Sequence, residues 1–321
     1  MFDLSICIVN TSNIRFLKPC LHSIFQYTQR ITFEIIVVDN NSIDGSVEVV
    51  QREFPQVKLI ISQVTKGFAA NMNMALREAC GRYVVLLNDD TLLISNIFAE
   101  MVAFMDANPQ YGAVGPKLLN EDGSFQLGPR GPATIWTLMY WEFKLDQLFP
   151  KSRLFGAFRM TCWDPNSSCE MQAASGACIF VRNGVLEQVG LLEEGISLGP
   201  DDVELSYRIR KAGWKLYYLA SQSLIHYGEV SKVRIQAKSM ISMYKGFYWF
   251  LGHHFGWLQA NLYRLFSSTG ALIRIVGWLF IYLAIPRKRS RALDRIQGRW
   301  GILRLSLSPH LKQIITQEHK K

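Results

Sequence analysis

Apolar and polar positions along the first hundred residues predict strands and helices in alternation. Mainly apolar segments, typical of strands, cover residues 4–9, 33–38 and 57–61, and an unbroken apolar run, typical of a strand buried on both faces, covers residues 83–87. Between and after these runs, apolar residues recur at helical spacing over residues 14–27, 46–50, 68–80 and 94–106. Strand and helix therefore alternate four times, which predicts an α/β fold with a mostly parallel, Rossmann-like sheet flanked by helices.

Three of the predicted strands end abruptly in polar residues, namely Asn10, Asp39 and the segment 88–90. Parallel strands place their carboxyl ends on one edge of a sheet, and ligands bind just beyond that edge. The last segment contains two adjacent carboxylates, Asp89 and Asp90, which repel each other unless a cation lies between them. The pattern predicts a site for a hard divalent cation, and an ordinary solvated acidic turn is the alternative.

Two common phosphate-binding loops are absent from the sequence. A dinucleotide fold requires G-x-G-x-x-G after the first strand, but residues 10–13 contain no glycine, and G-x-x-x-x-G-K-[ST] occurs nowhere. A sugar-nucleotide nucleotidyltransferase would also carry a glycine-rich basic loop at residues 10–13. These absences favour a bound metal ion as the group that holds phosphates.

The second half of the chain first returns to strand-like apolarity over residues 171–181. A helix is predicted from Asp201 to Ala212, followed by strands over 214–219 and 223–227. Asp201 and Asp202 open that helix, where acidic side chains also favour the helix dipole. Aromatic residues gather between residues 136 and 158, which is typical of either a satellite core or an apolar groove for an acceptor.

The chain has 321 residues and a formal net charge of +9, which favours an acidic partner. Basic residues crowd residues 287–299, without any recognisable element for reading nucleic acid, so we expect no nucleic-acid partner. The six cysteines form no C-x-x-C pair, and we expect Cys7 and Cys80 to be buried thiols in a reducing compartment. The N-terminus lacks the pattern of a secretory signal, so a cytoplasmic protein is expected.

Residues 231–321 are aromatic and basic, and we expect them to form a helical region separate from a first domain of residues 1–230. An uninterrupted apolar run of eleven residues, 275–285, is followed by the basic residues 287–289. A membrane-spanning helix needs about 20 such residues, so an interfacial helix on an anionic membrane is favoured. Packing as a helical subdomain against the sheet is the alternative.

Taken in order, several stretches resemble the family 2 glycosyltransferases of the GT-A fold, in particular rhamnosyltransferase-like members that build bacterial surface polysaccharides. The stretches cover roughly residues 4 to 228 and are Ser5 to Asn13, Glu34 to Ser46, Gly67 to Asn73, Gly81 to Thr91, Pro116 to Gly123, Ser175 to Cys178, and Asp201 to Leu205 with Ala212-Gly213-Trp214 and His226. Each stretch is weak by itself, and their common order and spacing carry the resemblance.

The resemblance implies roles for individual residues. It implies that the donor nucleotide is bound by Asn10, Asp39, Asn41, Asn73 and Asn88. It implies that Mg²⁺ or Mn²⁺ is held by Asp89, Asp90 and His226, although a structural role for a single histidine is equally open. Asp202 occupies the place of the general base and Asp201 that of its glutamate neighbour, so either carboxylate is a candidate. The acceptor is expected to contact Ser175, Gly176 and Trp214.

The implied activity is transfer of a hexose, with rhamnose favoured, from a nucleoside-diphosphate sugar to a polyprenyl-diphosphate-linked or glycan acceptor. A single base and no second carboxylate for a covalent intermediate predict inversion at the anomeric carbon. The enzyme is expected to lie on the inner face of the cell membrane. A nucleotidyltransferase and a non-enzymatic basic membrane-associated protein are the alternatives.

Overall fold

The computed structural model describes residues 2–195, 199–228 and 236–308. Contacts divide these residues into two compact units. The first unit contains residues 2–131, 163–195 and 201–228, and the second contains 132–162, 199–200 and 236–308. This division differs from the boundary expected near residue 230, because residues 132–162 group with the C-terminal helices through long-range contacts that the local pattern does not indicate.

The first unit alternates strands and helices as the apolar pattern predicts. Its elements are β1 (Leu4–Asn10), α1 (Ile14–Tyr27), β2 (Phe33–Asn40), α2 (Ser46–Glu53), β3 (Lys58–Ser62), α3 (Phe68–Glu78), β4 (Tyr83–Asn88), β5 (Thr91–Leu93), α4 (Ile97–Ala107), β6 (Tyr111–Leu119), β7 (Phe125–Gln126), β8 (Cys169–Met171), β9 (Cys178–Arg182), α7 (Asn183–Val189), α8 (Asp201–Lys211) and β10 (Lys215–His226).

The described strands form one ten-stranded sheet whose main path is β3-β2-β1-β4-β9-β6-β10-β5. Strands β1, β2, β3 and β4 are mutually parallel, and β6 and β10 run in the same direction because β9 is antiparallel to both β4 and β6. Strands β5, β7 and β8 pair antiparallel with their neighbours. The prediction of a mostly parallel sheet in an α/β fold is therefore confirmed.

Some predicted elements have different limits. The two strands expected over 214–219 and 223–227 are one strand, β10, with an irregularity between Leu219 and Ser223. The stretch 171–181 divides between β8 and β9, and β6 was not predicted at all. The segment 94–106 begins as a helix only at Ile97, because residues 91–93 pair with β10.

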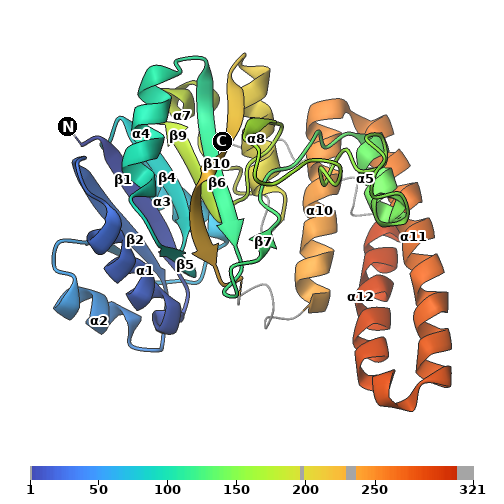
Figure 1. Cartoon of the computed structure of the whole chain (residues 1–321). Coiled ribbons are helices and arrows are strands. Elements are labelled where there is room, and N and C mark those ends of the chain that lie inside the picture. The colour runs from blue at the N-terminus through green and yellow to red at the C-terminus, as the bar shows by residue number, and fades with distance from the viewer. Residues whose placement is uncertain (1, 196–198, 229–235, 309–321) are drawn as a thin grey trace. The chain divides into compact units, whose positions relative to one another are not determined.

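Helices cover both faces of the sheet, and each face has its own core (Figure 1). Alternate residues of β1 show why: Ile6 and Ile8 pack with α1, α2 and α4, whereas Cys7 packs with α3, α7 and α8. Burial on both faces explains why the segments of β1, β2 and β4 are mainly apolar rather than alternating. Cys7 is a buried thiol as expected, but Cys80 is exposed, because it lies beyond the end of α3 rather than in the core.

The second unit is helical. It contains α5 (Ile135–Glu142), α6 (Leu145–Leu148), α10 (Gln236–Phe255), α11 (Trp257–Ala284), the 3₁₀ turn η1 (Pro286–Lys288) and α12 (Arg289–Leu307). The aromatic residues of the 136–158 segment include Trp141, which packs against Tyr244 and Phe247 of α10. Trp141 therefore belongs to a satellite core within this unit rather than to an open groove.

Helix α11 is much longer than the apolar run that the sequence shows. The run 275–285 is its last part, and the helix extends back to Trp257, giving 28 residues. At 1.5 Å per residue it is about 42 Å long, which exceeds the roughly 30 Å of a bilayer core. Length and composition therefore make α11 the one candidate span among the described residues. The length argument against a span, which rested on eleven residues, was wrong.

Candidate active site

The carboxyl ends of β1, β2 and β4 lie side by side. Asn10 pairs with Asp39 across β1 and β2, and Val9 pairs with Asn88 across β1 and β4. Asn10 and Asp39 are almost completely buried. The Asn10 side-chain amide donates to Asp39 Oδ2 at 2.9 Å and to Ser42 Oγ at 3.0 Å. Asn10 Oδ1 is buried with no hydrogen-bond partner, so this end of the sheet has an unused acceptor beside a carboxylate.

The acidic segment forms a tight turn between β4 and β5. Thr91 Oγ1 donates to the Asn88 carbonyl at 2.8 Å, which closes the turn. Asp89 is 7% exposed and Asp90 is 2% exposed. Carboxylates buried to this degree require hydrogen bonds, a paired cation or a metal ion. Below the turn, burial raises the pKa of the Cys20 thiol to about 12, so this group is neutral at physiological pH.

His226 lies beside this turn at the end of β10. The antiparallel pairing of β10 with β5 sets Thr91 opposite His226, and the Tyr227 N–H donates to the Asp90 carbonyl at 2.9 Å. The His226 Nε2 atom is 3.2 Å from Asp90 Oδ1 and 3.2 Å from Asn88 Nδ2. Two residues 136 positions apart are thus held with their side chains in contact.

Asp202 reaches the same edge through the segment before β9. Its Oδ2 accepts the Gly176 N–H at 3.0 Å, and its Oδ1 accepts the Val203 N–H at 2.7 Å. One residue further along, the Ala177 carbonyl accepts the Asn88 N–H at 3.0 Å. Since β9 is antiparallel to β4, with Cys178 opposite Leu87, residues 175–177 continue past the end of β4. These bonds place the Asp202 carboxylate near the acidic turn.

The pair Asp90–His226 has the donor chemistry for a divalent cation. Carboxylate oxygen and neutral imidazole nitrogen suit Mn²⁺, and Mg²⁺ is held through one or two carboxylates together with substrate phosphates. Among residues 2–195, 199–228 and 236–308, no group of three or more His, Cys, Asp or Glu side chains is arranged to hold a metal ion. The described side chains thus fit a cation that takes its remaining ligands from a bound diphosphate or water.

Four other residues given roles from the sequence lie close to this edge. Ser175 Oγ accepts the Ala177 N–H at 3.4 Å, and Gly176 contacts Asp202 as described. Asn41 follows β2 in the left-handed conformation, with φ 58°, and is exposed. Asp201 is the first residue of α8, directly before Asp202.

Asn73 is not brought to the acidic turn by any contact in the described structure. Its side-chain amide donates to the Leu192 carbonyl and to Glu194, and its Oδ1 accepts the Leu192 N–H. These bonds use both of its polar atoms to attach the segment after α7 to α3. The geometry therefore gives Asn73 a structural role.

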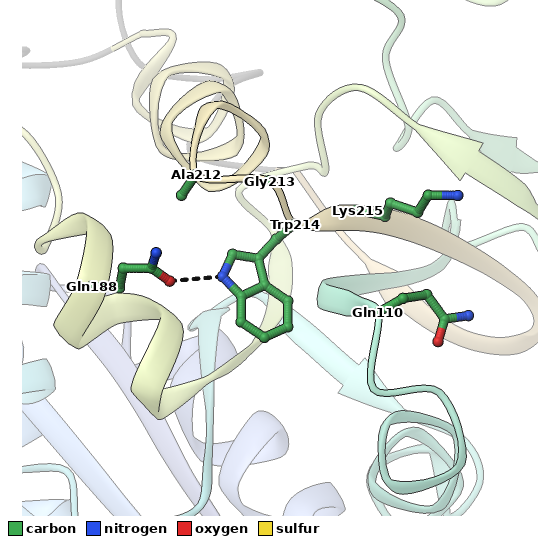
Figure 2. Close-up of a pocket in the computed structure, with 6 residues that line it drawn as sticks. All are labelled: Gln110, Gln188, Ala212, Gly213, Trp214 and Lys215. Carbon is green, nitrogen blue, oxygen red and sulfur yellow. Dashed lines mark hydrogen bonds between the residues drawn. The ribbon is translucent and has the colours of Figure 1, made fainter.

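Trp214 lies at the opposite end of β10 from His226, immediately before its first residue. Figure 2 shows its indole N–H donating to Gln188 Oε1, at 2.8 Å. Around it is a cavity of about 350 Å³, lined by Gln110, Gln188, Ala212, Gly213, Trp214 and Lys215. The cavity lies at the first residue of β10 and the acidic turn lies at its last residue, so the full length of the strand is between them. The structure therefore does not bring Trp214 together with Asp90 or Asp202.

Two residues that the sequence did not single out contribute to the edge. Ser42 accepts hydrogen bonds from the Asn10 amide and the Ser12 N–H, and its own N–H donates to Asp39. Gln126 contacts His226, at 2.6 Å between Oε1 and Nδ1. Gln126 belongs to a two-residue strand in a polar stretch, and nothing in the local pattern distinguishes it from its neighbours.

A mostly parallel α/β sheet flanked by helices, with an acidic turn at its carboxyl edge, matches the GT-A fold. Residues 5–162 match the family profile described as glycosyl transferase family 2, and the chain belongs to this family. It is therefore a glycosyltransferase, and neither a nucleotidyltransferase nor a non-enzymatic scaffold. One similar protein is the N-acetylglucosaminyl-diphospho-decaprenol L-rhamnosyltransferase of Mycobacterium tuberculosis. It is 27% identical over 312 residues, which cover 88% of this chain and 94% of that protein.

Two solved structures show the same fold. GalNAc-T7 with UDP, GalNAc and Mn²⁺ has a TM-score of 0.60 at 16% identity, and the match covers 84% of this chain and about half, 51%, of that one. A mannosyltransferase from Pyrobaculum calidifontis in complex with GDP-Man and Mn²⁺ has a TM-score of 0.55 at 15% identity, covering 95% of this chain and 87% of that one. Both of those structures contain Mn²⁺.

Proposed function

We propose that this glycosyltransferase moves a hexose, with rhamnose favoured, from a nucleoside-diphosphate sugar to a polyprenyl-diphosphate-linked or glycan acceptor, with inversion at the anomeric carbon. The observation that carries the proposal is the approach of three groups at one sheet edge: the Asp90–His226 pair, the buried Asn10–Asp39 pair and the Asp202 carboxylate. The acceptor and the sugar follow the name of the mycobacterial relative.

The donor nucleotide is assigned to the Asn10–Asp39 side of the edge. Asp39 accepts hydrogen bonds from the Asn10 amide and the Ser42 N–H, so its position is fixed before a ligand arrives. Asn10 Oδ1 supplies an acceptor that a base N–H or a ribose hydroxyl could satisfy. Asn41 and Asn88 flank this region at the ends of β2 and β4.

Asp90 and His226, with Asp89 in the same turn, would hold Mg²⁺ or Mn²⁺ here. When bound, such a cation neutralises the negative charge that develops on the leaving diphosphate. The protein's own contribution is to fix these side chains beforehand, through the turn closed by Thr91 and the β5–β10 pairing. Preorganised groups of this kind need not rearrange during the reaction.

Asp202 is proposed as the general base. Each of its oxygens accepts one backbone N–H, from Gly176 and Val203, which orients the carboxylate and leaves further lone pairs for the acceptor hydroxyl. As the acceptor oxygen bonds to the anomeric carbon, its proton passes to Asp202, and the bond from that carbon to the diphosphate breaks. One displacement from the opposite face inverts the configuration.

Substitution of the proposed base tests this assignment. Asp202→Asn keeps the shape of the side chain but cannot accept the proton, and we expect turnover to fall by a factor of about 10² to 10⁴. Donor affinity, measured by thermal shift with Mn²⁺ and a panel of nucleotide sugars, should change little. Asp201→Asn is the matched comparison and should reduce turnover less. Near-normal turnover in Asp202→Asn would show that Asp202 is not the general base.

We also propose that the second unit attaches the enzyme to the cytoplasmic face of an anionic membrane without crossing it. One face of α11 is used inside the unit, through residues such as Tyr263, Gly270 and Ala271, and Arg274 is paired with the buried Glu142. Large apolar side chains project elsewhere along the helix, with Val276, Phe280 and Leu283 each at least 67% exposed. A helix with one face packed on protein and the other apolar suits the membrane interface.

Basic residues stand where this apolar surface ends. Arg287, Lys288, Arg289 and Arg291 are exposed at the turn between α11 and α12, which run side by side (Figure 1). Each Lys or Arg near an anionic surface contributes on the order of 1 kcal/mol of attraction. The charge and the apolar surface together match a phosphatidylglycerol-containing bilayer.

Vesicle binding tests this attachment. Arg287→Glu with Lys288→Glu should lower binding to phosphatidylglycerol vesicles at least tenfold, whereas neutral phosphatidylcholine vesicles should bind weakly in every case. Arg30→Glu with Lys211→Glu, exposed residues of the first unit, is the charge-matched control. Alkaline carbonate should release the protein from cell membranes. Retention after carbonate would show that α11 spans the bilayer.

A further inference from the structure

His226 is held from behind by Gln126, the second residue of the short strand β7. The His226 Nδ1 atom is 2.6 Å from Gln126 Oε1, while its Nε2 atom faces Asp90 and Asn88. Which ring nitrogen carries the proton decides whether Nε2 offers a lone pair or an N–H to the Asp90 side. The surrounding hydrogen bonds determine this.

The orientation of the Gln126 amide follows from its other contacts. Its Nε2 donates to the His226 backbone carbonyl at 3.0 Å and to Asn120 Oδ1 at 3.0 Å. The backbone carbonyl is an unambiguous acceptor. Asn120 is oriented in turn, because its Nδ2 donates to Ser124 Oγ and to the Phe125 carbonyl. Both hydrogens of the Gln126 amide are therefore used, and the atom facing the imidazole is the oxygen.

An amide oxygen can only accept a hydrogen bond. The imidazole must therefore carry its hydrogen on Nδ1, and in the neutral ring Nε2 holds the lone pair. That lone pair accepts from Asn88 Nδ2 at 3.2 Å and also faces Asp90 Oδ1 at 3.2 Å. Two electron-pair donors this close repel each other unless a proton or a metal ion lies between them. A divalent metal ion meets that requirement, since it accepts electron pairs from both.

We propose that Gln126, supported by Asn120, is a positioning residue that fixes the Nδ1–H tautomer of His226 and so presents Nε2 to the cation at Asp90. The inference rests on the proposed metal dependence. Outer hydrogen-bond partners of this kind orient metal-binding histidines, and their loss commonly weakens metal affinity by a factor of about 10 to 100. Gln126 itself touches neither donor nor acceptor in this assignment.

The first test needs neither metal nor activity. In the full-length, metal-free protein with ¹⁵N-labelled histidine, at about pH 8 where an ordinary imidazole is neutral, long-range ¹⁵N–¹H couplings distinguish the two tautomers. His226 should show a protonated Nδ1, identified by the loss of its signals in His226→Ala. In Gln126→Leu the tautomer should shift toward Nε2–H, and a protonated Nε2 in the wild-type protein would overturn the inference.

The second test measures the affinity for Mn²⁺ alone by electron paramagnetic resonance of the free ion. Gln126→Leu should weaken binding about 10- to 100-fold. Gln126→Glu keeps an acceptor toward Nδ1 and should restore affinity to within a few-fold, which a merely structural role would not predict. Gln110→Leu, at the other end of the sheet, is the matched control. Wild-type binding with unchanged affinity in Gln126→Leu refutes this inference alone. If the wild-type protein binds no Mn²⁺ even when pyrophosphate is added to supply the diphosphate ligands, the metal dependence is refuted, and the tautomer measurement still decides the role of Gln126.

Discussion

Glu142 offers the sharpest test of what holds the second unit together. Its side chain is fully buried, and the Arg274 guanidinium donates both to its Oε1 and to its backbone carbonyl. The Tyr244 hydroxyl donates to Oε2, and Arg299 donates to the Tyr244 oxygen at 3.0 Å. The carboxylate thus joins α5 to α10, α11 and α12. We consider its replacement by Leu, which is similar in size and carries no charge.

The expected loss follows from burial. Arg274 is 15% exposed, so Glu142→Leu leaves a largely buried guanidinium without its counter-charge. Breaking one side of a buried ion pair costs about 3–5 kcal/mol. Replacing both partners with apolar residues, by combining Glu142→Leu with Arg274→Met, removes the unpaired charge and should recover most of this loss. The exposed ion pair Lys58–Glu78, whose side chains are about half exposed, is the comparison. Breaking it with Glu78→Gln should lower the free energy of unfolding by at most about 1 kcal/mol.

Because the chain has two units, one free energy of unfolding does not describe both, and a local measurement is required. Native-state hydrogen exchange of the α5 and α11 amides reports the free energy of opening where the pair lies. Glu142→Leu should accelerate exchange there, with β1 and β4 of the first unit unchanged. The reasoning is refuted if the single variant exchanges like the wild type, or if the double variant is no more protected than the single one.

Three further outcomes are expected. The pKa of Asp3 is lowered to about 2 by the Thr32 N–H and Arg82, so its contribution to stability is present above about pH 4 and is lost as the pH falls toward 2. Hydrogen exchange of the β1 amides at several pH values should show this loss in the first unit, and Asp3→Asn should make it smaller. Gly270→Ala should destabilise the second unit by about 1–3 kcal/mol despite the better helix propensity of alanine, because its Cβ would collide with the Glu142 side chain, which Arg274 holds in place. Slower hydrogen exchange of the α11 amides would contradict this. Arg182 donates to three backbone carbonyls at the end of α4 and the start of β6, so Arg182→Ala should destabilise the first unit by about 2–3 kcal/mol, measured by hydrogen exchange of the α4 and β6 amides. A loss below about 1 kcal/mol would show that water replaces these bonds.

Much of the first unit could be predicted from local pattern because β1, β2 and β4 are buried on both faces and are therefore mainly apolar runs. The limits of α1 and the first residues of β1, β2 and β4 agree with those runs. Parallel pairing then follows from the alternation of strand and helix, and it places Asn10, Asp39 and Asn88 together at one edge. For this part of the site, local sequence and the geometry of parallel sheets were sufficient.

The remainder depended on contacts between distant residues, which no local pattern encodes. Only the insertion of antiparallel β9 between β4 and β6 connects Asp202, through Gly176, to the end of β4. Gln126 acquires its relation to His226 across 100 positions of sequence, and Glu142 finds Arg274 across 132. The sequence by itself determined the parallel sheet and its polar edge, because the apolar strand segments, their polar ends and the alternation of strand and helix are all local properties of the chain. The orientation of the imidazole and the packing of α5 with the C-terminal helices were decided only by the tertiary structure, because they depend on hydrogen bonds and burial that exist once distant segments meet.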